Sequence, residues 1–260
     1  MNHSMPDIIV ALGPADNSAK PGSLPRILLL ALAVACTLSA PAQAQQTSLE
    51  AGVAAKDRGH FATAIRAWQP LAESGVPEAQ NNIGHMYEEG LGVAQNYTTA
   101  MRWYRQAADN DLPEAMHNIG LLYYNGYGVA ENPREAVRWF RQAAEQDIVP
   151  AQYMLGLAYQ QGKGVDLDYR EARRWFLKAA RQGSVNAQFM YAYMLQAGEG
   201  ADESNPFGAY VWATIAERSG FTDAGDVSAV AVILLEDDEV AEADAVINNC
   251  LGDGLSDCPA

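Results

Sequence analysis

The sequence predicts an all-α fold in which about five helix pairs stack into a solenoid, followed by a capping pair. Small and aromatic residues recur with a period of 36 over much of the chain. Each 36-residue unit contains two amphipathic segments, and paired glycines separate them. Because two amphipathic helices cannot bury their apolar faces alone, consecutive units must stack on one another.

The first 44 residues have the pattern of a secretory signal peptide. Arg26 precedes an apolar run at 27–35, and a small-x-small sequence ends at Ala44. The run is too short to span a bilayer. We therefore expect cleavage near Ala44 and a periplasmic or secreted protein with no transmembrane segment. Lipidation of Cys36 is the alternative interpretation.

Residues 45–78 are predicted to form an opening helix pair with a short loop at Gly59. Three units without gaps follow, at 79–114, 115–150 and 151–186. The residues that all three units share include, in unit 79–114, Ala79, Gly84, Tyr87, Gly90, Gly92, Trp103, Ala107 and Ala108. The repeated tyrosines and tryptophans are expected to lie in the core.

The first helix of each unit is predicted from an apolar stripe such as Ala79, Ile83 and Tyr87, spaced i, i+4, i+8. The Gly-x-Gly pair then ends the helix and turns the chain.

The second helix is predicted from its N-terminal signals. Asn132 is followed by Pro133 and, at the third helical position, by Glu135, which is a capping-box arrangement. Asp168 repeats this arrangement, and Asn96 supplies a cap alone.

The repeated pattern resembles the Sel-one-like repeat, a relative of the tetratricopeptide repeat. It reads A-x₄-G-x₂-Y-x₂-G-x-G-V-x₂-[ND]-x₃-A-x₂-W-[YF]-x₂-A-A in three units. The resemblance implies a right-handed α-α superhelix, with the first helices lining the concave surface, that acts as a scaffold or adaptor for other proteins. Residues 45–78 resemble a tetratricopeptide-type unit. Residues 187–224 resemble a divergent fourth unit, in which Ala192 replaces a glycine and one residue is inserted before Trp212.

The remaining residues, 225–260, are predicted to form an acidic cap and tail. Two helices are expected, at 227–235 and 240–250, with Asp237 or Asp238 as the N-cap of the second.

The cysteines of this tail, Cys250 and Cys258, are the two that remain after removal of the signal peptide. In an oxidising compartment they are candidates for a disulfide that would stabilise only the tail. Two free thiols are the alternative.

The net charge of −15 is concentrated at one end of the chain. Residues 45–198 hold 14 basic and 16 acidic side chains, whereas residues 199–260 hold 14 acidic side chains and one basic residue, Arg218. A chain of this charge lacks the basic surface that nucleic acids require, and it is unsuited to an anionic membrane. We therefore expect no nucleic-acid partner.

Motifs that carry chemistry are missing from the sequence. It has no P-loop lysine, no His-x₃-His or Cys-x₂-Cys pair, and no Gly-x-Ser-x-Gly or Ser-x-x-Lys. We expect no catalytic residue, no metal and no cofactor. Two alternatives are an envelope hydrolase acting on β-lactams or peptidoglycan and a secreted factor acting on another cell. Relatives that interact with penicillin-like compounds carry paired cysteines within each unit, which these repeats lack.

Functional residues are expected where the first helices differ between units. The candidate partner-binding residues are Asn82, His85, Asn118, Leu121, Met154, Leu157, Met190 and Tyr193. They change from polar to apolar along the chain and, together with Met194, suit the docking of a peptide or helix. In the alternative interpretation the apolar residues pack against the fourth unit and the cap. We expect a monomeric, non-catalytic scaffold or adaptor of the bacterial cell envelope.

A row of arginines recurs on the second helices, at Arg66, Arg102, Arg138 and Arg174. It is either a surface for an acidic partner or a solvated helix face.

Overall fold

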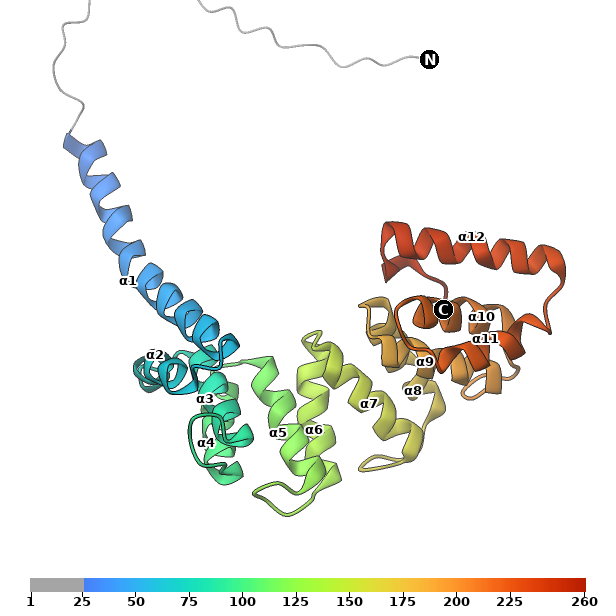
Figure 1. Cartoon of the computed structure of the whole chain (residues 1–260), viewed down its shortest axis with the longest axis horizontal. Helices are drawn as coiled ribbons and strands as arrows, with labels where there is room; N and C mark the ends of the chain where they lie inside the picture. Colours follow the sequence, from blue (N-terminus) through green and yellow to red (C-terminus); the bar gives the residue numbers. More distant parts are fainter. Residues whose placement is uncertain (1–25) are drawn as a thin grey trace, which may run out of the picture. The chain divides into compact units, whose positions relative to one another are not determined.

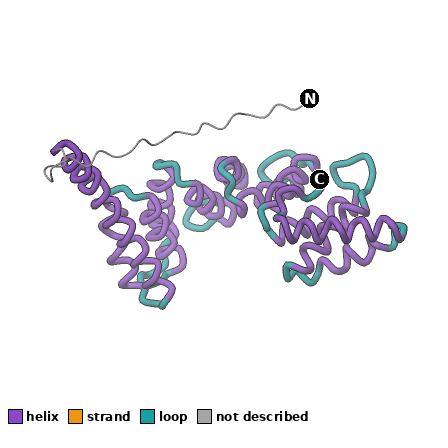
Figure 2. The backbone as a smooth tube through the Cα atoms, turned by 90° about the horizontal axis from the view of Figure 1, so that it is seen from above, coloured by secondary structure: helices purple, strands orange, loops and turns teal. Residues whose placement is uncertain are grey.

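The computed structural model of the protein describes residues 26–260, which contain twelve α-helices, one short 3₁₀ helix and no strand (Figures 1 and 2). The helices are α1 (Arg26–Asp57), α2 (Phe61–Glu73), α3 (Pro77–Glu89), α4 (Tyr97–Ala108), α5 (Pro113–Asn125), α6 (Pro133–Glu145), α7 (Val149–Gln161), α8 (Tyr169–Arg181), α9 (Val185–Ala197), α10 (Pro206–Arg218), α11 (Ala224–Val232), α12 (Asp237–Asp253) and η1 (Leu255–Asp257). Residues 47–260 form one compact unit.

The predicted α-α solenoid is confirmed by the packing within this unit. Consecutive helices pack against each other from α2 through to α11, and α12 packs against α10. Contacts restricted to near neighbours are the defining property of repeat architectures.

The predicted signal peptide falls partly outside the described residues, which begin at Arg26. The rest of it is the first part of α1, which continues through the predicted cleavage site to Asp57. Within the described part of the chain, no helix has both the length and the apolar character needed to cross a membrane.

The predicted N-caps of the second helices are confirmed. The side chains of Asn96, Asn132 and Asp168 each accept a hydrogen bond from the backbone N–H of the third residue onward, at 2.9, 3.2 and 3.1 Å. Asn205 caps α10 in the same way, at 2.8 Å. The extra residue of the fourth unit is therefore absorbed in the loop before Asn205, and α10 keeps the 13 residues of α6 and α8.

The predicted capping box at these helices is wrong. The Glu135 carboxylate forms an ion pair with Arg138 at 2.9 Å, and that of Glu171 with Arg174 at 2.7 Å. The carboxylates thus point along the helix surface toward an arginine three residues later, where a full positive charge is the stronger partner.

The two glycines of each interhelical loop have different roles, as Gly162 and Gly164 show. Gly162 ends α7 in the left-handed conformation, with φ +65°. Gly164 also has a positive φ, of +87°, and a side chain there would collide with the carbonyl oxygen of Pro133, at the start of α6. The second glycine therefore lets each loop lie directly on the preceding unit.

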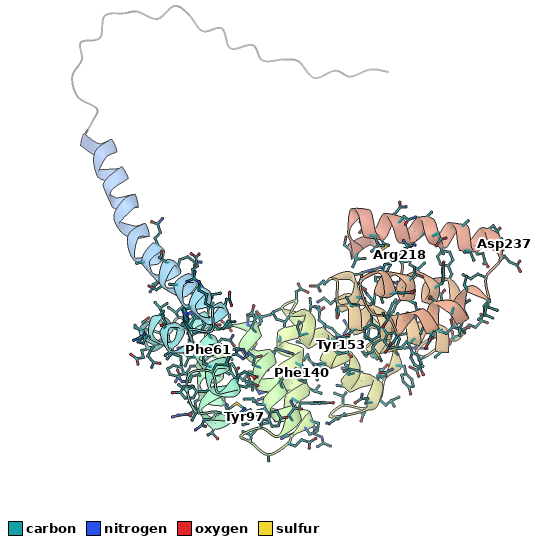
Figure 3. The ribbon with its side chains drawn as sticks, viewed as in Figure 1. Phe61, Tyr97, Phe140, Tyr153, Arg218 and Asp237 are labelled. Carbon is teal, nitrogen blue, oxygen red and sulfur yellow. A yellow bond between two sulfur atoms is a disulfide. The ribbon has the colours of Figure 1, made fainter. Side chains whose placement is uncertain are left out.

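The core contains a column of aromatic rings, one residue after the predicted tryptophan column. Its members are the fully buried Trp68, Tyr104, Phe140 and Phe176. Each ring lies on a glycine of the preceding helix, namely Gly52, Gly84, Gly120 and Gly156, where an added Cβ would meet ring atoms. Phe140 is labelled in Figure 3, within the interior formed by the helices.

The prediction that all repeated tryptophans lie in the core is correct for Trp175 and Trp212, which are buried. It is wrong for Trp103 and Trp139, which are half-buried. Neighbouring positions on a helix differ by about 100° in direction, so Trp103 and Trp139 lie toward the edge of the core when Tyr104 and Phe140 point into it.

In the fourth unit Ala192 stands at the position of Gly156, and Ala213 at that of Phe176. Both alanines are fully buried. A larger residue on the first helix is therefore matched by a smaller one on the second.

The C-terminal cap begins differently from the prediction. Glu236, and not Asp237 or Asp238, is the N-cap of α12. Its backbone is extended, and its N–H donates to the carboxylate of Glu239 at 2.9 Å, which completes a capping box. Glutamate is an uncommon N-cap, so sequence preference favoured the aspartates.

The tail is held against the solenoid. Cys250 and Cys258 are joined by a disulfide, and both are buried. The Arg181 guanidinium donates to the Cys258 carbonyl at 2.6 Å, and Trp212 Nε1 donates to the Pro259 carbonyl at 2.9 Å. The tail thus covers α8 and α10, whereas the sequence led us to expect a loop that stabilises only itself.

Candidate functional site

The eight candidate partner-binding residues occupy two equivalent positions on four successive first helices. We call them the groove rows: Asn82 and His85 on α3, Asn118 and Leu121 on α5, Met154 and Leu157 on α7, Met190 and Tyr193 on α9. Seven of them are half-buried, and the side chain of Tyr193 is 46% exposed. None is fully buried, so each presents some surface.

The two ends of the groove rows have different surroundings. At the polar end, Asn118 Nδ2 donates to Asn81 Oδ1 on the preceding first helix, at 3.0 Å. At the apolar end, Leu157 and Met190 pack against the edge of the C-terminal core cluster. Met194, which we expected beside them, is fully buried and belongs to the core. Its side chain points inward because it lies one position after Tyr193 on the same helix.

Beside the groove rows runs a column that sequence reasoning did not single out, occupied by Asn81, His117, Tyr153 and Phe189. The His117 ring lies 5.6 Å from the ring of Phe140, and its Nδ1 has no hydrogen-bond partner in the structure. Burial lowers the pKa of His117 to about 4, so this histidine is neutral at pH 7.

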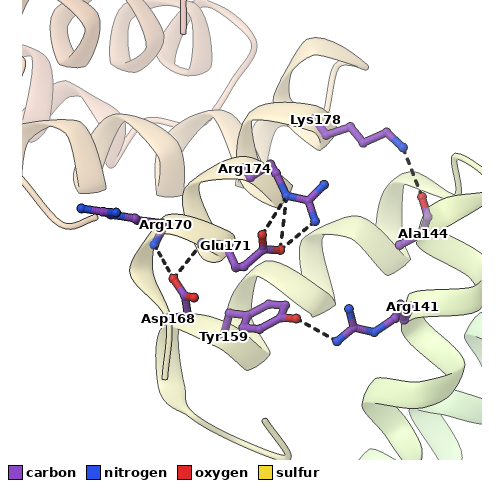
Figure 4. A network of polar contacts seen from close by, with 8 residues as sticks. All are labelled: Arg141, Ala144, Tyr159, Asp168, Arg170, Glu171, Arg174 and Lys178. Atoms are coloured by element: carbon purple, nitrogen blue, oxygen red, sulfur yellow. Dashed lines mark hydrogen bonds and ion pairs between the residues drawn. The ribbon is translucent and has the colours of Figure 1, made fainter. Parts of the chain in front are cut away.

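The repeated tyrosines that follow the groove rows hold neighbouring units together. Arg105 Nη2 donates to the Tyr123 hydroxyl at 2.8 Å. Arg141 Nη2 donates to the Tyr159 hydroxyl, also at 2.8 Å (Figure 4). Each bond joins a second helix to the first helix of the next unit. These tyrosines are consequently structural.

A partly buried polar pair between α3 and α4 was also missed by sequence reasoning. The Tyr104 hydroxyl donates to the Glu88 carboxylate, and burial, followed by the charge of Glu88, raises the pKa of this tyrosine above its ordinary value. The varying position of Glu88 gave no signal for this bond.

The predicted arginine row shows one local arrangement in the four units that contain it. Each arginine contacts the side chain three residues earlier: Arg66 to Thr63, Arg102 to Thr99, Arg138 to Glu135 and Arg174 to Glu171. Arg138 and Arg174 remain 62% and 57% exposed. Such pairing within one helix is typical of a solvated helix face, and it leaves Arg138 and Arg174 accessible to a partner.

No group of three or more His, Cys, Asp or Glu side chains with the geometry to hold a metal ion occurs among the described residues.

The Sel1 repeat family model matches residues 77–112, 113–148, 149–184 and 185–221, which is more than half of the chain. The chain belongs to the Sel1 repeat family. In this Sel1 repeat protein the matched units begin at the first residue of α3, α5, α7 and α9. Sel1 repeats generally form scaffolds for protein–protein interaction and are typically non-catalytic.

Solved structures of bacterial proteins share this fold. A Sel1 repeat protein from Oxalobacter formigenes is 31% identical, with a TM-score of 0.63 over 68% of this chain and 72% of that one. A protective antigen of uropathogenic Escherichia coli with an SLR fold is 26% identical, with a TM-score of 0.71 over 82% of this chain and 46% of the other. A putative Sel1 repeat protein from Klebsiella pneumoniae is 20% identical, with a TM-score of 0.50 over 72% of this chain and 93% of its own. No curated protein matches the chain.

Proposed function

We propose that this Sel1 repeat protein is a non-catalytic scaffold or adaptor of the bacterial cell envelope that binds a protein or peptide along the groove rows. The supporting observation is that the eight residues at two varying positions on four successive helices all retain exposed surface. The neighbouring columns that do not vary are used for packing between units.

The apolar end of the groove rows is the part on which binding depends most. Methionine adapts its shape to different partners, and tyrosine combines an apolar ring with a polar hydroxyl. Met154, Leu157, Met190 and Tyr193 bring both properties to α7 and α9, beside the buried core. A helix or an extended segment with apolar side chains is the expected occupant.

Export is the second part of the proposal. The apolar run and the small residues before Ala44 support removal of residues 1–44 by signal peptidase. We expect the mature protein, expressed in a Gram-negative host, to be recovered from the periplasm with Gln45 as its first residue. A protein retained at full length in the cytoplasm would contradict export, and a lipid-sized mass increase would establish the alternative at Cys36.

A pull-down from the periplasm of the native host tests the binding surface. Leu157→Asp combined with Tyr193→Asp should remove the partner, because two charges replace apolar contact area. A matched control carries Tyr127→Asp and Leu167→Asp, since these side chains are 46% and 54% exposed but lie in loops between paired helices. Loss of the partner in both variants, or in neither, would contradict the groove rows as the binding site.

The non-catalytic part of the proposal has its own test. Purified protein incubated with a β-lactam or with peptidoglycan should leave both intact. Turnover that increases with protein concentration would contradict it.

A further inference from the structure

Helix α8 carries an unusual concentration of positive charge for this acidic chain. Its 13 residues include five basic side chains and one acidic side chain. We define the α8 stripe as Arg170, Arg173, Arg174, Leu177, Lys178 and Arg181. Their spacing places them on one face of the helix, with Leu177 near its centre.

The other repeat units act as internal references for this helix. At four positions of the stripe α8 departs in chemical type from all three preceding second helices. Arg173 replaces an apolar residue, Leu177 a polar one, Lys178 an uncharged one and Arg181 an acidic one. The residues replaced are Ile65, Met101 and Val137; Gln69, Arg105 and Arg141; Pro70, Gln106 and Gln142; and Glu73, Asp109 and Glu145. The preceding units therefore stack without such residues. On α8 three of the four also contact the C-terminal end: the Arg173 guanidinium lies 5.9 Å from the centre of the Tyr191 ring, Leu177 packs against the C-terminal core cluster, and Arg181 bonds to the Cys258 carbonyl.

The exchange at Leu177 changes the surface directly. Its equivalents Arg105 and Arg141 donate to a tyrosine of the next unit, whereas Leu177 and the residue at that tyrosine position, Leu195, are both apolar. Two cavities flank Leu177, of about 390 and 290 Å³. Their shared walls are Arg174 and Leu177, and cationic side chains of the α8 stripe line both.

Neighbouring groups orient the cations of the α8 stripe without neutralising all of them (Figure 4). Arg174 forms an ion pair with Glu171 at 2.7 Å, and Lys178 forms one with Asp147 at 2.9 Å. Arg181 is bonded to the carbonyl of Cys258, which carries no net charge. The charge of Glu145 also acts on Arg174. With these three carboxylates against five cations, the surface keeps excess positive charge.

We propose that the α8 stripe binds an acidic segment of a partner protein, with an apolar side chain of that segment resting on Leu177 between the two cavities. The stripe covers eleven residue steps, or about 17 Å, which suits a short helix or strand. A protein segment fits better than a polyanion for two reasons. The centre of the stripe is apolar, and the net charge of −15 repels extended polyanions such as nucleic acid. This surface lies on a second helix, so it is separate from the groove rows.

The test uses the mature protein and a fluorescent synthetic peptide of Glu and Asp residues around one central Leu, measured by anisotropy at about 0.15 M salt, where the Debye length is about 8 Å. Arg170→Glu combined with Arg174→Glu should weaken binding by about tenfold or more, because complementary charge is replaced by repulsion. The matched control is Arg134→Glu with Arg138→Glu, at the same two positions of α6. The control should stay within about twofold of the wild type, since distant surface charges are screened.

A second pair of measurements isolates the apolar contact. Leu177→Gln introduces the uncharged residue that stands at this position in the opening unit, as Gln69. It should weaken binding of the Leu peptide but not of a peptide with Ser in place of Leu. Circular dichroism of every variant should match the wild type, because all the changed side chains are at least partly exposed.

Three results would overturn the proposal. Equal weakening by the α6 and α8 variants would show that only total charge matters. Equal effects of Leu177→Gln on both peptides would remove the apolar anchor. The third result is that heparin or anionic lipid vesicles bind more tightly than the peptide and that this binding is lost in the α8 variant. It would assign the α8 stripe to a polyanion.

Discussion

The regular array, α3 to α8, and the C-terminal end, from α9 onward, share one helix-pair geometry but pack it differently. In the array a glycine on the first helix meets an aromatic ring on the second, as Gly156 meets Phe176. In the C-terminal end Ala192 and Ala213 occupy these positions, and the disulfide-bonded tail bonds to Trp212. The repeat backbone therefore accepts two packing solutions at these positions.

The two regions also differ in charge. The array and the residues before it are nearly neutral, whereas residues 199–260 have 14 acidic side chains and one arginine. The α8 stripe and the apolar end of the groove rows both lie near the junction of these regions. Departures from the repeat are concentrated where the packing solution changes, which is why both proposed binding surfaces include α7, α8 or α9.

The largest expected effect concerns the glycine–aromatic pairs of the array. Phe176→Ala should lower the free energy of unfolding by about 3–5 kcal/mol, because a fully buried ring is lost. The matched change in the C-terminal end, Ala213→Gly, should lower it by about 1 kcal/mol through helix propensity. Urea unfolding followed by circular dichroism measures both. Equal losses would contradict different packing in the two regions.

The disulfide should act on the C-terminal end alone. Replacing Cys250 and Cys258 by serine opens a short loop and should cost about 2–3 kcal/mol. Hydrogen exchange should become faster in α12 and η1 but not in α3 to α6, because contacts in a solenoid reach only neighbouring elements. Faster exchange throughout the array would show that the tail stabilises more than one end.

Acid should weaken the array through His117. Its pKa is about 4 in the folded protein, against about 6.5 for an exposed histidine, so the unfolded state binds more protons between these values. Stability should therefore fall as the pH decreases from 7 to 5, with His117 contributing up to about 2 kcal/mol. His117→Phe, which copies Phe189 at this position of α9, should remove that contribution. An unchanged pH dependence of the unfolding free energy in this variant would contradict the assignment.

The smallest expected difference in stability is between two buried glutamines at equivalent positions, Gln152 on α7 and Gln188 on α9. Gln152 donates to the Ala144 carbonyl at 3.3 Å, and its Oε1 accepts from Gln182 at 3.0 Å. Gln188 makes the equivalent donation, but its Oε1 has no partner in the structure.

Gln188 Oε1 lacks a partner because Ser219, in the C-terminal end, stands where the array has Gln182. Gln152→Met should therefore cost about 1–2 kcal/mol, and Gln188→Met less. Thermal unfolding compares the two, with Met116 as the natural precedent at this position. A larger loss for Gln188→Met would contradict this account of the pairing.

Much of the fold could be predicted because the repeat supplies several independent signals in each unit. Asn or Asp recurs at the position before the second helix and acts as its cap, as Asn132 and Asp168 do, and the Gly-x-Gly pair marks each loop. Which of two neighbouring aromatic side chains points into the core was harder to predict. Trp139 and Phe140 are both aromatic, so the pattern alone did not show that the second of them is fully buried.

The candidate site was predictable in part. The groove rows follow from the variation between first helices, and the second helices vary in the same way. Arg173, Leu177 and Arg181 depart from the repeat in the sequence itself. The contacts of the tail with Arg181 and Trp212 had no signal in the sequence, because they join residues far apart in the chain.

Photo-crosslinking at two equally exposed tyrosines tests the central claim, that this solenoid binds a protein through the apolar end of the groove rows. Tyr193 on α9 and Tyr127 in the α5–α6 loop are both 46% exposed. With benzoylphenylalanine at either position and the protein expressed in its own host, we predict a discrete crosslinked protein from Tyr193 and none from Tyr127. A crosslinked protein from Tyr127 and none from Tyr193 would contradict the claim.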